Sequence, residues 1–382
     1  MSTGWREAGL RYQSIHWFLG QKFGCRVAKV SVDAGFTCPN VDGTVGSGGC
    51  VFCNIRSFSP SRRWSGAYSI TQQIDETVRR LRRPRGPTRF LAYFQPATNT
   101  YAPVDRLRTV FAEAANHPDI VGLLIGTRPD CVPEETLDLL AEFSRRTWVV
   151  IEYGLQTIHA RSLEWLQRGH TLDAFLDAAA RTRARGLAFG VHLILGIPGE
   201  TRDDVLATAR VVAASNAHSI KLHNLYAVRD TRLAELVSHG KVRLLDLDEC
   251  ARQVVDFLEV TPPECVVDRL GGTAPPEYLV APPWCQDKSA LRLAVEAEFV
   301  RRDSWQGKML RASSDRAAGT PPRSPSVDSN PRPFSENGTG RKVILDSEAG
   351  RMAAGSQGKG RHIGSEAWER EESPGSTGQG GG

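Results

Sequence analysis

The chain has 382 residues, of which 40% are hydrophobic and 24% are charged, a composition typical of a globular protein. Its net charge of +5 is too small to indicate a nucleic-acid partner by itself. No apolar stretch is long enough to span a bilayer, and the first residues do not have the pattern of a secretory signal. We therefore expect a cytoplasmic protein with no membrane partner, in which clustered cysteines bind a metal more readily than they form disulfides.

Short apolar runs separated by helical patterns predict six buried strands. The predicted strands cover residues 27–32, 90–94, 120–125, 148–153, 189–195 and 220–225. Helical spacing of apolar residues predicts helices over 69–83, 104–116, 133–145, 171–185 and 203–214. Strands joined by helices favour a parallel α/β sheet, either open and doubly wound or a barrel of six βα units. In both, ligands bind where the carboxyl ends of the strands meet.

Three regions of different composition follow one another along the chain. We expect residues 1–240 to form the core, 241–302 a small extension packed on it, and 303–382 a disordered tail. The tail is rich in Gly, Ser and Pro and has few apolar side chains to bury. Its basic and acidic residues nearly balance, which does not favour a nucleic-acid-binding arm. Within the tail, only residues 342–345 are apolar enough to dock on the rest of the protein as a strand or a brief lid.

A glycine-rich loop, GFTCPNVDGTVGSGGCVFCN, follows the first predicted strand and contains Cys38, Cys50 and Cys53. Its cysteines can reach one metal centre, and its glycines let the backbone fold closely around a bulky inorganic group. A structural zinc site and a ferredoxin-type cluster both take four protein ligands. Three ligands on a 4Fe–4S cluster leave one iron open to bind a substrate or cofactor. The alternative is a zinc site whose fourth ligand is Cys25, Cys131 or His16.

This loop resembles that of radical S-adenosylmethionine (SAM) enzymes, whose three cysteines hold a 4Fe–4S cluster. Most of that superfamily has the spacing C-x3-C-x2-C, whereas the longer first gap found here is similar to that of the YhcC-like family. Further segments also resemble that family and the radical SAM core of the Elongator catalytic subunit: YFQPATNTY, GTRPDCVP, EYGLQT with LQRGH, and HLILGIPGET. The resemblance runs from residue 20 to about residue 290 and implies a partial (β/α)6 radical SAM barrel.

The resemblance implies a radical SAM enzyme with a 4Fe–4S cluster and SAM as cofactors. Such an enzyme cleaves SAM reductively, and a 5′-deoxyadenosyl radical then abstracts a hydrogen from the substrate. It also implies an electron donor such as flavodoxin or ferredoxin. The Elongator-like motifs make a tRNA base one candidate substrate, and a small molecule or a protein side chain is equally open. The alternative function is a non-catalytic RNA-binding module that a metal or cluster stabilises.

Several residues are implied as SAM contacts by their place in the matching motifs. Gln156 and Arg168 match a pair that contacts SAM in the related anaerobic coproporphyrinogen oxidase. The resemblance implies that Gln156 binds the ribose and that Arg168 binds the SAM carboxylate, which a guanidinium suits, or a ribose hydroxyl. Gln95, Thr98 and Asn99 lie in the segment that recognises the methionine amino group.

Three more residues of the fifth strand and the turn after it complete this set. His192 replaces an acidic SAM ligand of the same oxidase, and the alternative is a buried core histidine. Gly196 and Pro198 form a tight turn where the backbone can approach the adenine closely.

Two charged motifs can be explained by their structural role alone, without a role in function. Asp130, in the Elongator-like TRPD stretch, is expected to cap the helix that begins near Pro133. The arginine-rich run 79–85 is expected to be a solvated helix end, with contact to a phosphate backbone as the alternative.

Overall fold

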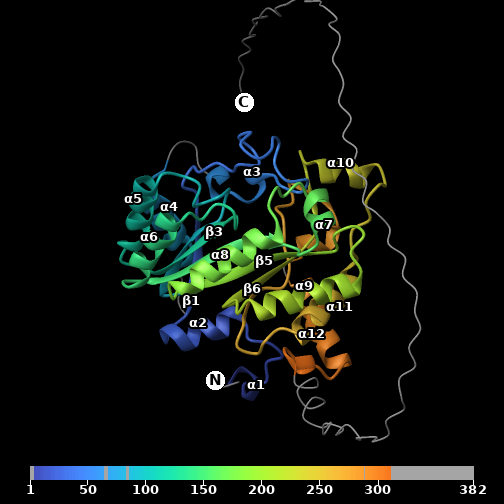
Figure 1. Cartoon of the computed structure of the whole chain (residues 1–382). Coiled ribbons are helices and arrows are strands. Elements are labelled where there is room, and N and C mark those ends of the chain that lie inside the picture. The colour runs from blue at the N-terminus through green and yellow to red at the C-terminus, as the bar shows by residue number, and fades with distance from the viewer. Residues whose placement is uncertain (1–3, 64–67, 83–85, 288, 311–382) are drawn as a thin grey trace, which may run out of the picture. The chain divides into compact units, whose positions relative to one another are not determined.

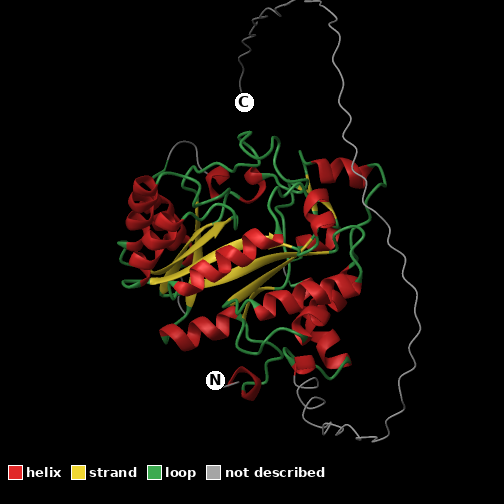
Figure 2. Cartoon of the chain, viewed as in Figure 1, coloured by secondary structure: helices red, strands yellow, loops and turns green. Residues whose placement is uncertain are grey.

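The computed structural model describes residues 4–63, 68–82, 86–287 and 289–310. In this part of the chain, helices flank a curved sheet of parallel strands (Figure 1; Figure 2). The expected tail beyond residue 310, including residues 342–345, and residues 83–85 of the arginine-rich run lie outside the described residues.

The main sheet has seven parallel strands in the order β1-β2-β3-β4-β5-β6-β8. Their bounds are β1 (Val27–Val32), β2 (Arg89–Phe94), β3 (Ile120–Thr127), β4 (Trp148–Gln156), β5 (Ala188–Leu195), β6 (Ser219–Asn224) and β8 (Val266–Arg269). The spatial order follows the chain without the reversal that defines a doubly wound sheet. The architecture is therefore a curled half-barrel, as the family resemblance implies, and the doubly wound alternative is wrong.

The seventh strand, β8, was not predicted. It lies within residues 241–302, which were expected to pack on the barrel as an extension, and it pairs with β6 as an edge strand of the same sheet. Its four residues include Asp268 and Arg269, so the apolar run is too short to indicate a strand. A separate two-stranded sheet pairs β7 (Ala227–Val228) with β9 (Leu279–Ala281).

Each predicted helix is present, and further helices occur before β1, after the cysteine loop, between β4 and α8, and after β6. Side-chain caps define several of the starts: Ser69 and Thr201 form capping boxes, and Thr171 accepts from the backbone of Ala174. The helices are α1 (Gly4–Glu7), α2 (Ile15–Phe23), α3 (Ile55–Phe58), η1 (Pro60–Arg63), α4 (Ile70–Leu81), α5 (Val104–Ala115), α6 (Glu134–Ser144), α7 (Ala160–Trp165), α8 (Leu172–Ala184), α9 (Arg202–Ala214), α10 (Arg232–Ser238), α11 (Leu247–Glu259), η2 (Pro283–Gln286) and α12 (Ala290–Arg301).

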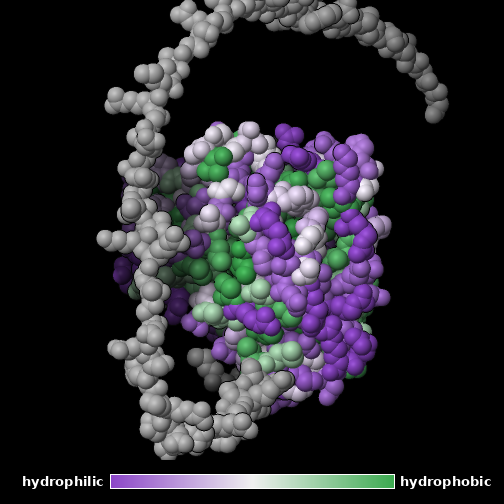
Figure 3. Space-filling view, turned by 45° about the vertical axis from the view of Figure 1, so that its right-hand side comes forward, coloured by the Kyte–Doolittle hydropathy of each residue, from purple (hydrophilic) through white to green (hydrophobic). Residues whose placement is uncertain are grey.

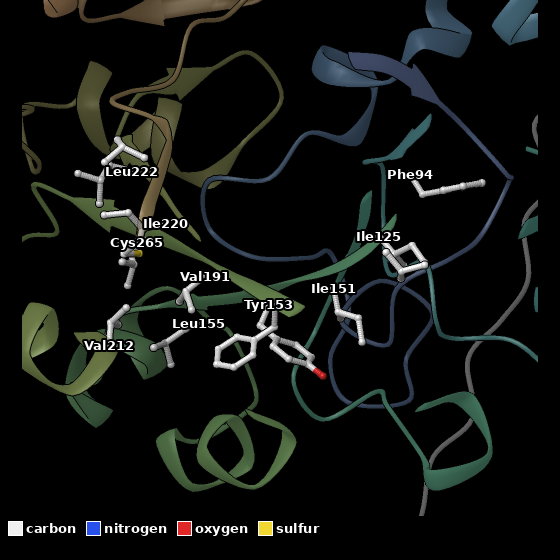
Figure 4. Close-up of a cluster of buried hydrophobic side chains, with 14 of the residues drawn as sticks. Phe94, Ile125, Ile151, Tyr153, Leu155, Val191, Val212, Ile220, Leu222 and Cys265 are labelled. Carbon is white, nitrogen blue, oxygen red and sulfur yellow. The ribbon is translucent and has the colours of Figure 1, made fainter. Parts of the chain in front are cut away.

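The main core lies between the sheet and the helices on its convex side. Figure 4 shows part of it, where Ile151, Tyr153 and Leu155 of β4 pack beside residues of the neighbouring strands. Successive strand residues face opposite sides, so Glu152 and Gln156 of the same strand face the inside of the barrel. Alternate residues of β4 thus pack in the hydrophobic core and line the inside of the barrel.

Helical faces turned away from the sheet are largely hydrophilic. In Figure 3, hydrophilic residues cover much of the visible face, and hydrophobic ones are exposed in smaller groups. None of the helices in the described part of the chain has the length and apolar character needed to cross a membrane.

Packing continues beyond residue 303, where the tail was expected to begin. Ser304 and Gln306 are fully buried. The Ser304 hydroxyl donates to Glu259 Oε1 over 2.6 Å, and Gln306 Nε2 donates to the carbonyl oxygens of Pro262 and Cys265 over 2.6 and 2.8 Å. Polar side chains that find buried partners hold this segment in place, which a count of apolar residues does not detect.

Candidate functional site

A cavity of about 760 Å³ lies at the carboxyl ends of the strands, a volume in the range of small-molecule sites. It brings together most of the predicted site residues, namely Cys38, Cys50, Cys53, Gln95, Thr98, Gln156, Arg168 and His192. Gly196 and Pro198 are not part of its lining. Gly196 instead packs against Leu245, whose Cγ would lie 2.7 Å from an added Cβ, so the need for glycine there comes from the protein itself.

The three thiols of the cysteine loop lie within electrostatic range of one another. Burial raises the pKa of Cys53 to about 12, and the neighbouring Cys50 and Cys38 thiols add to the shift. The Cys50 sulfur accepts hydrogen bonds from Asn40 Nδ2 and Arg168 Nη1, each at 3.3 Å. Amide and guanidinium donors stabilise a negatively charged sulfur, so this donor set fits a thiolate that ligates a cluster.

A single-zinc site does not fit this geometry. Within the residues that the structure describes, no three His, Cys, Asp or Glu side chains converge closely enough to hold one metal ion. Of the proposed fourth ligands, Cys25 is not near the other three cysteines. It packs with Leu19 and Val27 in a separate apolar cluster. Three thiols spread around an open cavity are better suited to a cluster of several irons than to one ion.

The cysteine loop is docked on the turn that carries Arg168. Asn40 Nδ2 donates to the carbonyl oxygens of Gln167 at 2.8 Å and of Arg168 at 3.1 Å. At Gly169 the backbone is left-handed (φ +66°), and an added Cβ would lie 2.5 Å from Val45 Cγ1. Only glycine satisfies both the backbone angle and the close packing at this position.

Arg168 and Gln156 lie together over the end of β4. Arg168 Nη2 donates to the Gly154 carbonyl at 2.8 Å, and a Cβ at Gly154 would lie 2.8 Å from Gln156 Nε2 and 3.0 Å from Arg168 Nη2. Gln156 is itself left-handed (φ 73°), which is uncommon for a residue with a Cβ and is found where function imposes strain. The predicted pair is therefore brought together in the cavity.

His170, beside them, is held neutral. Burial lowers its pKa to about 4, and the Arg168 charge adds to this effect. Its Nε2 accepts from Arg168 Nε at 3.2 Å. The helix that follows, α8, takes Thr171 as its N-cap, so His170 does not cap it.

Asp130 does not cap a helix as expected. The helix α6 begins after Pro133 without a side-chain cap. Both Asp130 oxygens accept from Arg128, from Nε at 2.9 Å and from Nη2 at 2.7 Å. Arg128 in turn donates through Nη1 to the Arg168 carbonyl at 2.6 Å. The TRPD stretch thus braces the turn of Arg168, with Arg128 buried and Asp130 at the surface.

The segment after β2 has divided roles. Asn99 is fully buried, and its amide donates to the carbonyl oxygens of Phe94, Pro96 and Gly126, so it braces the loop. Thr98 lines the cavity and is also buried, but its hydroxyl has no hydrogen-bond partner among the described residues. A buried hydroxyl without a partner indicates that a polar ligand completes the site.

Sequence reasoning missed a network of buried charges inside the barrel. Lys221 Nζ lies 2.5 Å from Glu152 Oε2, 3.2 Å from Asp268 Oδ2 and 2.9 Å from the Tyr93 hydroxyl. Lys29 pairs with Asp268 from the opposite edge of the sheet. The sequence does contain a sign of this network, because charged residues occur inside the apolar runs of the predicted strands. Charged side chains are costly to bury unless they are paired.

The network orients His192 toward the cavity. Burial alone would raise the pKa of Glu152, but the Lys221 charge holds it well below its usual range. Burial and the Lys221 charge lower the pKa of His192, whose Nε2 lies 2.7 Å from Glu152 Oε2. An ionised carboxylate can only accept a hydrogen bond, so the neutral imidazole must donate to it. Nε2 therefore carries the proton, and Nδ1 is an acceptor.

Comparison with known proteins gives consistent matches along the chain. Residues 43–212 match the family model described as the radical SAM superfamily, and residues 217–301 match the radical SAM C-terminal domain. YtqA of Bacillus subtilis (strain 168) is 36% identical over 308 residues, which cover 81% of this chain and 95% of YtqA. YhcC of Escherichia coli (strain K12) is 37% identical over 271 residues, which cover 71% of this chain and 86% of YhcC.

A solved structure shares the fold. The archaeal Elp3 of Methanocaldococcus infernus, with an N-terminal deletion, superposes with a TM-score of 0.55 at 16% sequence identity. The match covers 73% of this chain and 64% of the Elp3 chain. It shows that the two chains share the arrangement of strands and helices.

Proposed function

Because the chain belongs to the radical SAM superfamily, we propose that Cys38, Cys50 and Cys53 hold its 4Fe–4S cluster. The superfamily uses this cluster together with SAM. The observation that carries the proposal is the hydrogen bond from Arg168 to the Cys50 sulfur, because it joins the predicted cluster ligands to a predicted SAM contact in one cavity.

When bound, the reduced cluster would supply the electron for reductive cleavage of SAM, and SAM would supply the 5′-deoxyadenosyl group that takes a hydrogen atom from the substrate. The chain's own residues bind and orient the reactants. Arg168 offers its guanidinium to the SAM carboxylate or a ribose hydroxyl, Gln156 offers its amide to the ribose, and the unpaired Thr98 hydroxyl serves the methionine amino group. His192 also lines the cavity, and its Nδ1 would be available as an acceptor.

Alanine variants of the three cysteines test the ligand assignment. Cys38→Ala, Cys50→Ala and Cys53→Ala should each abolish the absorbance shoulder near roughly 400 nm that marks a bound Fe–S cluster. Cys25→Ala, a change in a thiol under the barrel, is the matched control and should keep it. The measurement requires anaerobic reconstitution because exposed thiolates oxidise readily. Retention of the shoulder in Cys38→Ala with loss in Cys131→Ala would contradict the assignment.

Formation of 5′-deoxyadenosine tests the activity. The reconstituted protein, reduced with dithionite, should release 5′-deoxyadenosine from SAM, and flavodoxin or ferredoxin should replace dithionite as electron donor. An intact, reducible cluster that yields none, with or without cell extract, would favour a non-catalytic RNA-binding module.

For the substrate, a tRNA base is one candidate, supported by the Elongator-like motifs and the shared Elp3 fold. Comparison of modified nucleosides between a deletion strain and its parent tests this candidate. A change confined to small metabolites would exclude tRNA in favour of a small-molecule substrate.

A further inference from the structure

Three arginines line the cavity, and the guanidinium groups of two of them each bind several protein atoms on the cluster side. Arg128 binds both oxygens of Asp130 and the Arg168 carbonyl. Arg168 binds the Cys50 sulfur, the Gly154 carbonyl and His170. These contacts hold both guanidinium groups on the cluster side of the site, where Arg168 is proposed to contact SAM.

The third, Arg269, is engaged through one nitrogen. It is the last residue of β8 and is half-buried, and its Nε donates to the Gly271 carbonyl at 2.6 Å. Within the described residues, no carboxylate lies within ion-pair distance of its guanidinium, and neither Nη group has a hydrogen-bond partner there. The Nε contact fixes the guanidinium, which leaves a planar pair of donors available to a ligand.

The residues around Arg269 leave its charge uncompensated. Of the carboxylates that line the cavity, Glu152 is bound by Lys221 and His192, and Glu277 is exposed. Burial lowers the pKa of His223 well below its usual range, and the Arg269 charge adds to this shift, so His223 is neutral. A fixed cation without a counter-ion inside a cavity attracts an anion.

We propose that Arg269 binds an oxyanion of the substrate, a carboxylate or a phosphate, in the part of the cavity formed by β6 and β8. The proposal rests on the function proposed above, because Arg168, beside the cluster cysteines, is assigned to the SAM carboxylate. In the sheet, β5 and β6 separate β8 from the strand that carries Gln156. An anionic group held at β8 therefore leaves the SAM contacts free and orients the rest of the substrate toward the SAM side of the cavity.

Anion binding to the cluster-reconstituted full-length chain, without reductant, tests the proposal. The probes are inorganic phosphate and acetate, compared with chloride at constant ionic strength, and the readout is the rise in Tm. We expect at least one probe to raise the Tm of the wild type and of Arg243→Gln, a control in an exposed ion pair. Arg269→Gln should need on the order of tenfold more anion for the same rise.

Each arm of the experiment has a defined meaning. A response to phosphate indicates a phosphate-bearing substrate, and a response to acetate indicates a carboxylate. Arg269→Lys, which keeps the charge without the planar fork, should bind more weakly than the wild type, and it serves if the glutamine variant does not fold. The proposal is overturned by the absence of a Tm rise in the wild type, or by equal responses in wild type and variants.

Saturating SAM separates the substrate anion from the SAM carboxylate. The Tm rise should persist with SAM bound, and its loss would overturn the proposal by assigning Arg269 to SAM. The anion readout requires no SAM cleavage. Failure to form 5′-deoxyadenosine would therefore contradict the proposed function while the anion result stands by itself.

Discussion

Gly169 joins the cysteine loop to the turn of Arg168, and no other residue type fits between them. Both its left-handed backbone and the contact with Val45 exclude a side chain. We expect Gly169→Ala to displace the loop, and with it the three thiols, so that the variant reconstitutes little cluster, measured as iron and sulfide per chain. Gly240→Ala is a matched control, because Gly240 has nearly the same φ (+67°) and nothing within 4 Å of an added Cβ. Equal cluster content in the two variants would contradict this role of the close contact.

His218 makes the stability of the protein depend on pH. It is packed between Phe18 and Trp148, and its Nε2 has no partner among the described residues. Burial lowers its pKa to about 4, and the nearby Lys22 charge adds to the shift. The folded state therefore keeps His218 neutral, whereas the unfolded state takes up a proton below about pH 6.5. The resulting stability is present above pH 6.5 and is lost as the pH falls toward 4.

We expect His218→Phe to lessen this loss. Between pH 7 and pH 5, His218 accounts for roughly 2 kcal/mol of the fall in the free energy of unfolding. Urea unfolding at the two pH values measures the difference, and the exposed His239→Gln serves as control. If His218→Phe loses as much stability as the wild type over this interval, the histidine is not responsible.

At the level of whole elements, the buried charges tie together strands that do not pair with one another. Lys221 of β6 contacts Tyr93 of β2 and Glu152 of β4 across the inside of the barrel. Asp268 of β8 binds Lys29 of β1, so this ion pair spans the two edges of the open sheet. The network therefore links strands across the inside of the barrel, and two of its members, Tyr93 and Glu152, also line the cavity.

Lys221→Met should destabilise the fold strongly. It would leave Glu152 and Asp268 without their shared cation, and removal of one partner from a buried ion pair costs about 3–5 kcal/mol. Arg243→Ala, which breaks the exposed pair with Glu249, should cost no more than about 1 kcal/mol. Chemical denaturation of both variants gives the comparison, and similar losses in the two would show that the buried network is not a principal support of the sheet.

For the whole molecule, the point where packing ends can be tested by truncation. Removal of everything after Leu310 should leave the unfolding free energy and the cluster content unchanged, because the residues beyond it contain few apolar side chains. Removal of everything after Ser304 should destabilise the protein, since it deletes the buried Gln306 and leaves the carbonyls of Pro262 and Cys265 without their donor. Thermal unfolding of the two truncated chains distinguishes these expectations. A stable chain ending at Ser304 would contradict the second.

The sequence by itself determined the six principal strands, the helices between them and the family resemblance. These features depend on local periodicity and on motifs whose residues are close together, such as the spacing of Cys38, Cys50 and Cys53. Because the carboxyl ends of parallel strands meet, it also indicated that Gln95, Thr98, Gln156, Arg168 and His192 would share one cavity with them.

Only the tertiary structure decided which polar residues serve the ligand and which serve the protein. The sequence could not show that Asp130 binds Arg128 instead of a helix end, or that Gly196 and Pro198 do not line the cavity. β8 also escaped prediction, because two of its four residues are charged, and one of them, Asp268, finds its partners on other strands. The physical reason is common to all these cases. Burial of a charged or polar group is favourable only beside a specific partner, and that partner is brought close by the fold, not by proximity along the chain.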